Sequence, residues 1–206
     1  TRGFSLVGGR RITDTLETTL GYMYQQSELS SFSNSFYLNY YRGKYTKSSI
    51  IPGVYYDNTD SYFFPKNGWK ANASLEYAGV GGDAEFLKYF GNLYFFKNLE
   101  DLIDVDLTFR FRSKLGYIQD NGYVPLNERF YLGGINSLRG YQTNSISPRD
   151  RFGTRIGANK TSYSSVELSY GLFETVPMRL SVFYDYGMLG KNDITQIRRS
   201  STGIAL

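Results

Sequence analysis

One arginine stands out for its chemistry, Arg139, which lies inside a glycine-rich stretch that spans residues 130–141. Because a guanidinium does not lose its charge, this side chain needs a carboxylate or water wherever the stretch packs. The pair Gly133 and Gly134 permits a tight turn at positive φ, and Gly140 lets backbone approach closely beside the arginine. The stretch is therefore expected to be a long loop that folds back onto a scaffold.

Two carboxylates could pair with Arg139, namely Glu167 and Asp185, which lie on consecutive strands expected after the loop. On both strands charged residues alternate with aromatic and aliphatic ones, so both carboxylates point away from the apolar face. Two alternatives remain open. The charges are merely solvated in a wet interior, or the carboxylates form an acid–base pair of the glycosidase kind, although nothing in the sequence marks a sugar cleft.

A second cluster of polar, glycine and proline residues lies over residues 56–69, where the sequence reads Tyr-Asp-Asn-Thr-Asp, Ser-Tyr and then Phe-Phe-Pro-Lys-Asn-Gly-Trp. It resembles the Tyr-Asp-x-x-Asp and Phe-x-Pro-x-x-Gly motifs of the BamA-type outer-membrane assembly factors. The stretch over 130–141 resembles the loop-six motif of the same family, Phe-x-x-Gly-Gly-x-x-x-Leu-Arg-Gly-Tyr. Both motifs stand in the family's order and at about its spacing, and the likeness runs along the whole chain.

The resemblance implies a β-barrel of sixteen strands that follows periplasmic POTRA domains. It also implies a loop-six arginine that enters the lumen and engages acidic groups at positions resembling Glu167 and Asp185. The implied function is to fold and insert β-barrel proteins into the bacterial outer membrane. The implied partners are unfolded outer-membrane clients, membrane lipids and accessory assembly lipoproteins, with no nucleic acid. No enzymatic activity, nucleotide, metal or other cofactor is implied.

The resemblance also assigns the site residues. In loop six they are Gly133, Gly134, Leu138, Arg139, Gly140 and Tyr141. The lumen partners of the arginine are Glu167 and Asp185. A periplasmic turn holds Asp57, Asp60, Pro65 and Gly68.

The composition limits the possible classes of protein. The mean hydropathy is −0.39 and aromatic residues make up 17% of the chain. No apolar run of about eighteen residues occurs, so no transmembrane helix is expected. A membrane barrel gives this combination because only every second strand residue faces lipid, although a soluble β-sandwich fits the composition equally well.

Charge and reactive residues exclude several functions. The net charge of +4 is too small and too scattered to indicate nucleic-acid binding. The chain has no cysteine, which excludes disulfides, thiolate zinc sites and cysteine nucleophiles. It has no histidine, which removes the usual general base and the Ser-His-Asp arrangement.

Residues that alternate between apolar and polar predict about nine spanning strands. They are expected near residues 2–7, 16–25, 48–57, 69–77, 86–96, 104–112, 166–172, 178–186 and from about 200 to the end. Nine strands would leave open edges, which hydrocarbon does not tolerate. The resemblance to a family with sixteen-stranded barrels implies that residues 1–206 form a single partial barrel domain, roughly the sixth to the fourteenth strand, without the POTRA domains and terminal strands.

Connections of two kinds alternate along the chain. Shorter ones are expected on one rim at 8–11, 58–68, 97–103 and 173–177, and mostly longer ones on the other at 27–47, 78–85, 118–161 and 189–199. Short periplasmic turns and long extracellular loops are typical of outer-membrane barrels. The strand-like segment over 36–41 is assigned to an extracellular loop, because counting it as spanning would move the Pro65 turn to the long-loop rim.

Two other functions fit parts of the sequence. A two-partner secretion pore, or a related polypeptide translocation channel of the same superfamily, shares loop six but moves an unfolded passenger outward. A passive porin has no need of an arginine behind a glycine pair.

Overall fold

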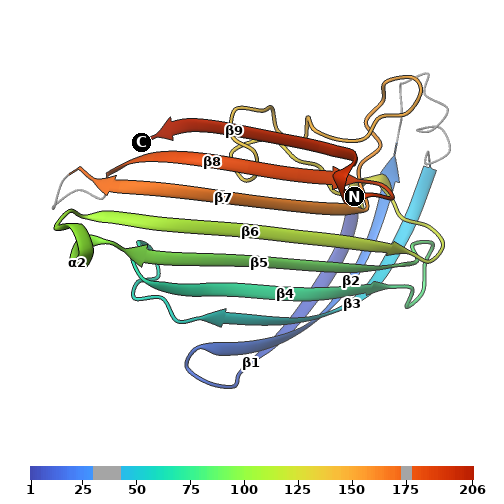
Figure 1. Ribbon diagram of the computed structural model, residues 1–206. Coiled ribbons are helices and arrows are strands. Elements are labelled where there is room, and N and C mark those ends of the chain that lie inside the picture. The colour runs from blue at the N-terminus through green and yellow to red at the C-terminus, as the bar shows by residue number, and fades with distance from the viewer. Residues whose placement is uncertain (30–42, 173–177) are drawn as a thin grey trace.

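One antiparallel sheet of nine strands in chain order forms the body of this computed structural model (Figure 1). The structure describes residues 1–29, 43–172 and 178–206. The strands are β1 (Arg2–Arg11), β2 (Leu16–Leu29), β3 (Gly43–Asp57), β4 (Gly68–Ala78), β5 (Phe86–Asn98), β6 (Leu107–Asp120), β7 (Lys160–Gly171), β8 (Arg179–Gly190) and β9 (Ile197–Ala205). The short helical segments are α2 (Glu100–Ile103), η1 (Leu126–Glu128) and η2 (Ile194–Gln196).

Side chains alternate strictly between the two faces of the sheet. On one face Arg110 stands opposite Glu167 in the register of β6 and β7. On the other face Val166 stands opposite Tyr184, and these two apolar side chains remain 39% and 47% exposed. A curled antiparallel sheet with a broad exposed apolar face is the arrangement of a membrane barrel, whose outer side chains contact lipid. The expected fold class, a partial transmembrane β-barrel, is confirmed.

The part of the chain that the structure describes contains no helix that is long and apolar enough to cross a membrane.

The connections depart from the prediction at several places. Gly8–Arg11 was expected to be a turn, but these residues continue β1 and pair with β2 as far as Arg11 opposite Glu17. The turn follows at Ile12, whose N–H donates to Leu16 O at 2.8 Å. The glycine pair therefore does not interrupt the ladder, because both residues keep their antiparallel partners.

Strand lengths were underestimated where polar residues occupy the ends. β3 begins at Gly43 and not at residue 48, β6 continues to Asp120, β7 begins at Lys160, and β9 begins at Ile197 and not at residue 200. Asp104 was placed in a strand, but it ends α2 with φ 53°. The expected segments over 36–41 and 173–177 lie outside the described residues.

The described connections on the loop-six rim differ widely in length. Residues 121–159, between β6 and β7 and hereafter called loop six, are far longer than the 79–85 and 191–196 connections on the same rim. The 58–67 connection on the opposite rim exceeds both of those.

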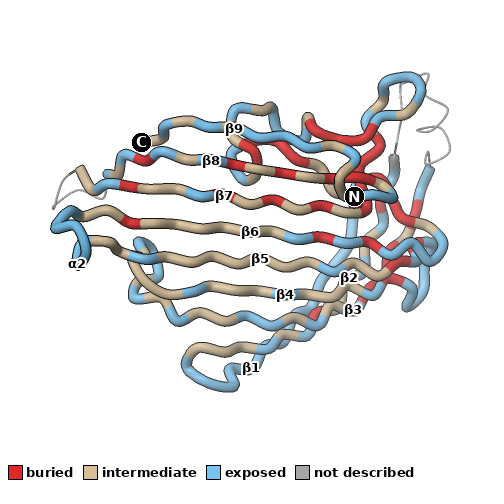
Figure 2. The backbone as a smooth tube through the Cα atoms, viewed as in Figure 1, coloured by how far each residue is buried: buried red, intermediate tan, exposed pale blue. Residues whose placement is uncertain are grey.

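Buried residues gather at the loop-six end of the sheet (Figure 2). One buried cluster consists of Leu132, Leu138, Ile146, Ala158, Tyr163 and Leu189. A second consists of Ala78, Ala84, Phe86, Ile118 and Val124. Both join loop-six residues to strand residues, so loop six folds back onto the charged face of the sheet, which is its lumenal face.

Candidate functional site

Loop six makes a tight turn immediately before the arginine. Gly133 and Gly134 have φ angles of 108° and 98°, which residues other than glycine rarely adopt. The turn closes through Gly134 N–H to Leu138 O at 3.0 Å and Gly133 N–H to Ser137 Oγ at 2.8 Å. A Cβ at Gly133 would lie 2.3 Å from Gln142 O, so this position also lacks room for a side chain.

The tip of loop six is seated on a glycine of the wall. Leu138 is fully buried, and its Cδ1 would lie 2.6 Å from a Cβ at Gly187 of β8. Tyr141 donates its hydroxyl to Ser200 O of β9 at 3.2 Å. Gly140 was expected to let backbone approach closely, and this was wrong, because nothing lies within 4 Å of a Cβ built there. Its φ of 83° is what favours glycine.

The structure places Arg139 directly against Asp185 of β8. Nε donates to Asp185 Oδ2 at 2.9 Å and Nη2 donates to Oδ1 at 2.7 Å, which is the bidentate geometry of a strong ion pair. The backbone N–H of Arg139 donates to Oδ2 as well, at 3.1 Å. Asp185 has no exposed surface, so water does not stabilise its charge. The donors of Arg139 do so instead, together with Ser165 Oγ, which donates to Asp185 Oδ1 at 2.6 Å.

The remaining donors of Arg139 reach β7. Nη1 donates to Glu167 Oε2 at 2.7 Å and Nη2 to Ser165 Oγ at 3.0 Å. The guanidinium carbon lies 3.4 Å from the centre of the Phe183 ring, a cation–π contact. The arginine therefore joins loop six to two adjacent strands at one point.

This geometry differs from an acid–base pair. Glu167 also pairs with Arg110 at 3.4 Å, so both carboxylates are bound by guanidinium groups. A hydrolytic pair needs its two carboxyl groups to flank an open space in which a bond is cleaved. The arrangement here is suited to bracing a loop against a wall.

A second ionic contact holds the beginning of loop six. Glu128 of η1 is 8% exposed and accepts from Lys47 of β3 at 2.6 Å and Lys88 of β5 at 3.1 Å. Lys47 also pairs with Glu76 of β4 at 2.9 Å. Burial raises the pKa of Glu128, but the positive fields of Lys88 and Lys47 outweigh it and hold this pKa below its usual value.

The 58–67 turn is organised by its two aspartates. Asp57 accepts from Thr59 N–H and Oγ1 at 3.0 and 2.7 Å. Asp60 accepts from the N–H groups of Lys66 and Asn67 at 2.9 and 3.0 Å. Each carboxylate thus replaces a missing backbone partner, as Asx turns do.

The glycine and proline of this turn have different surroundings. Gly68 has φ 108°, and a Cβ there would lie 2.7 Å from Asn58 O. Pro65 lines a lumenal hollow of about 690 Å³ together with Arg139, Glu167 and Phe64. The turn and loop six thus face the same lumenal space.

Comparison with known proteins identifies the family. The model of the Omp85 superfamily domain matches residues 1–206. The chain belongs to the Omp85 superfamily. Among its Omp85-related matches is the outer membrane protein assembly factor BamA of Nitratidesulfovibrio vulgaris, 33% identical over 137 residues. This alignment covers 64% of the chain and 17% of that BamA, so the chain spans about a sixth of the relative's length.

Two solved structures share the fold of this chain. BamA from Haemophilus ducreyi lacking POTRA domains 1–3 matches with a TM-score of 0.83 at 21% identity, over 98% of the chain and 47% of that structure. CdiB from Acinetobacter baumannii matches with a TM-score of 0.63 at 17% identity, over 97% of the chain and 34% of that structure.

Sequence reasoning about this Omp85 chain missed several contributors to the site. Ser165 follows the same alternation as Glu167, so the strand pattern could have placed it on the lumenal face. Phe183 could have been placed in the same way, because it lies two residues before Asp185 on the same strand. The pairing of Glu128 with Lys47 had no such signal, because the two residues lie 81 positions apart in the sequence.

Proposed function

We propose that this chain is the barrel portion of an outer-membrane assembly factor that folds and inserts β-barrel proteins into the bacterial outer membrane. The observation that carries the proposal is the contact of Arg139 with Asp185 and Glu167. This contact unites the family's loop-six arginine with two acidic residues of the lumenal wall. A passive pore has no need of a loop held so specifically across its interior.

The physical role of this contact is to brace the wall. A guanidinium bound to β7 and β8 fixes loop six inside the barrel and holds these strands in one arrangement. The free energy for insertion comes from the client, which buries its own apolar face in lipid as it folds. No nucleotide or metal is needed for that step.

The partners follow from the same role. Unfolded outer-membrane proteins are the clients, membrane lipids surround the apolar face, and accessory assembly lipoproteins act with the complete protein. Residues 1–206 supply a single partial barrel domain. The linear strand order supports this, since β1 and β9 do not pair with each other in the described part of the chain.

The test uses the complete protein that carries these residues, reconstituted in liposomes. The folding rate of a urea-denatured client barrel is measured with wild type, with Arg139→Ala and with empty liposomes. Wild type is expected to accelerate folding, and Arg139→Ala to lose most of the acceleration. Arg151→Ala is the matched control, because Arg151 is an exposed arginine of loop six that contacts Phe152.

The alternative, a two-partner secretion pore, gives a different result in the same assay. Folding no faster than in empty liposomes, together with a clear ion conductance, would support the pore and contradict the assembly function.

A further inference from the structure

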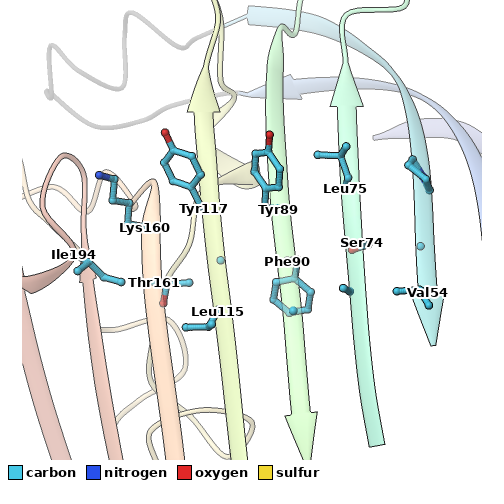
Figure 3. A pocket seen from close by; sticks show the side chains of 15 residues that line it. Val54, Ser74, Leu75, Tyr89, Phe90, Leu115, Tyr117, Lys160, Thr161 and Ile194 are labelled. Carbon is cyan, nitrogen blue, oxygen red and sulfur yellow. The ribbon is translucent and has the colours of Figure 1, made fainter. Parts of the chain in front are cut away.

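The lipid-facing side of the sheet contains a hollow of about 740 Å³ (Figure 3). Its floor is low where Ala73 of β4 and Gly91 of β5 stand opposite each other. The larger side chains of Val54 and Leu115 flank them in the same row. A small-residue floor between larger apolar residues makes a groove that an apolar chain can fill.

The groove continues along the strands toward the opposite rim. A second hollow of about 320 Å³ shares Val54, Ala73, Gly91 and Leu115 with the first and extends to Leu93. The two hollows together form a groove that is elongated along the strands. This shape fits a single acyl chain better than a protein surface.

Two tyrosines mark the end of the groove nearest loop six. The rings of Tyr89 and Tyr117 stack with centroids 5.9 Å apart, and both rings are more than a third exposed. Figure 3 shows their hydroxyls pointing the same way. Tyrosines in this position lie at the boundary between hydrocarbon and water. The groove therefore opens at the level of the lipid headgroups.

A cation stands at this opening. Lys160, the first residue of β7, pairs with Tyr117 in the register, and its Nζ lies 5.6 Å from the centre of the Tyr117 ring. Arg198 of β9 lies on the same face, since it pairs with Met188 and Met188 with Ser162. A lipid-facing cation is tolerated at the interface and attracts anionic headgroups.

Asp193, in the connection between β8 and β9, is an acidic group that lies within the electrostatic field of both cations. Hydrogen bonds from Thr195 are the main cause that lowers the pKa of Asp193, and the fields of Arg198 and Lys160 act in the same direction. Lys160 and Arg198 thus place two cations on the lipid-facing side near this end of the groove.

We propose that the groove over β4–β6 binds one anionic, phosphorylated membrane lipid, with an acyl chain lying over Gly91 and the phosphate beside Lys160. The proposal rests on the membrane placement of the sheet and not on the assembly function. A lipid satisfies both halves of the site at once, since it carries a charged head and a long apolar chain. A protein partner would leave Lys160 against an apolar interface, where an unpaired charge is costly.

The test is native mass spectrometry of the complete protein in micelles that contain phosphatidylglycerol or phosphatidylcholine with identical acyl chains. Wild type is expected to retain phosphatidylglycerol more tightly than phosphatidylcholine. Lys160→Gln is expected to weaken phosphatidylglycerol binding about fivefold and to leave phosphatidylcholine binding unchanged, because one interfacial lysine contributes about that factor. Gly91→Leu is expected to weaken the binding of both lipids.

Gly91→Leu is expected to leave the packing of the sheet unchanged, because a Cβ there meets only Asn72 O at 3.8 Å. The matched controls are Lys97→Gln, at the opposite end of the lipid-facing side, and Gly8→Leu, where a Cβ meets nothing within 4 Å. Both controls are expected to bind lipid like wild type. Equal retention of the two lipids by wild type would overturn the proposal, and so would a copurifying protein chain that only Gly91→Leu removes. The client-folding assay is independent of either outcome.

Discussion

Arg139 and Asp185 are joined through the backbone as well as the side chain. The carboxylate accepts from Arg139 N–H, Nε and Nη2 at 3.1, 2.9 and 2.7 Å. Because one donor belongs to the main chain, Asp185 fixes the path of loop six and not only the arginine tip. Asp185 is thus the common acceptor at which loop six meets β8.

Replacing Arg139 alone should lower the free energy of unfolding by more than replacing both Arg139 and Asp185. In Arg139→Ala the carboxylate of Asp185 stays fully buried without its main partner, so the free energy of unfolding is expected to fall by about 3–5 kcal/mol. Adding Asp185→Asn should restore part of this loss, because the uncompensated charge is gone. Urea unfolding of the complete protein in micelles measures Arg139→Ala, Asp185→Asn and the double variant, with Arg151→Ala as control. Additive losses in the double variant would contradict direct pairing.

The contact of Leu138 with Gly187 of β8 can be tested without changing any charged residue. Gly187→Val should push Leu138 out of its pocket, because a Cβ alone would lie 2.6 Å from Leu138 Cδ1. Overpacking of this kind costs about 1–3 kcal/mol, and loop six should become accessible to protease added outside the cell. Gly8→Val is the control, since its Cβ position is open. Equal protease resistance in both variants would show that this contact does not hold the loop.

The sequence predicts the alternation of the strands far better than their ends. Alternation is a local property of each strand, so the lumenal position of Glu167 and Asp185 follows from residue types alone. The ends depend on whether the partner strand continues, and β1 runs through Gly8 and Gly9 because β2 supplies partners for both. Backbone pairing between strands outweighs the turn preference of two glycines.

Long-range side-chain contacts were predictable only where a motif marked them. Arg139 could be assigned to acidic partners because its motif resembles that of a family. The contact of Glu128 with Lys47 and Lys88 has no motif, and it requires loop six to cover two other strands. Such a contact depends on the tertiary path of the loop, which residue spacing does not encode.

The ionic contact at η1 should control the order of the first part of loop six. Glu128→Gln leaves Lys47 and Lys88 near each other without their shared carboxylate, so like charges repel inside a buried site. Amide hydrogen exchange around Arg129, whose N–H donates to Leu126 O at 3.3 Å, is expected to accelerate. Exchange around the Arg139 turn should change less, because that turn has its own ion pair. Glu100→Gln, on the opposite rim, is the control.

The turn at Asp60 should give the protein an acid-sensitive element at the rim opposite loop six. Burial raises the pKa of Asp60. The hydrogen bonds from the N–H groups of Asn67 and Lys66 lower it by more, so the pKa in the folded protein lies below the ordinary value of 3.8. A lowered folded pKa means that the stabilisation is complete above the unfolded value and is lost as pH falls through the folded one. Asp60→Asn should therefore unfold at lower urea than wild type near pH 7. The two midpoints should converge as the pH falls below 3.8. A gap between midpoints that stays constant down to strong acid would show that the charge of Asp60 does not stabilise the turn.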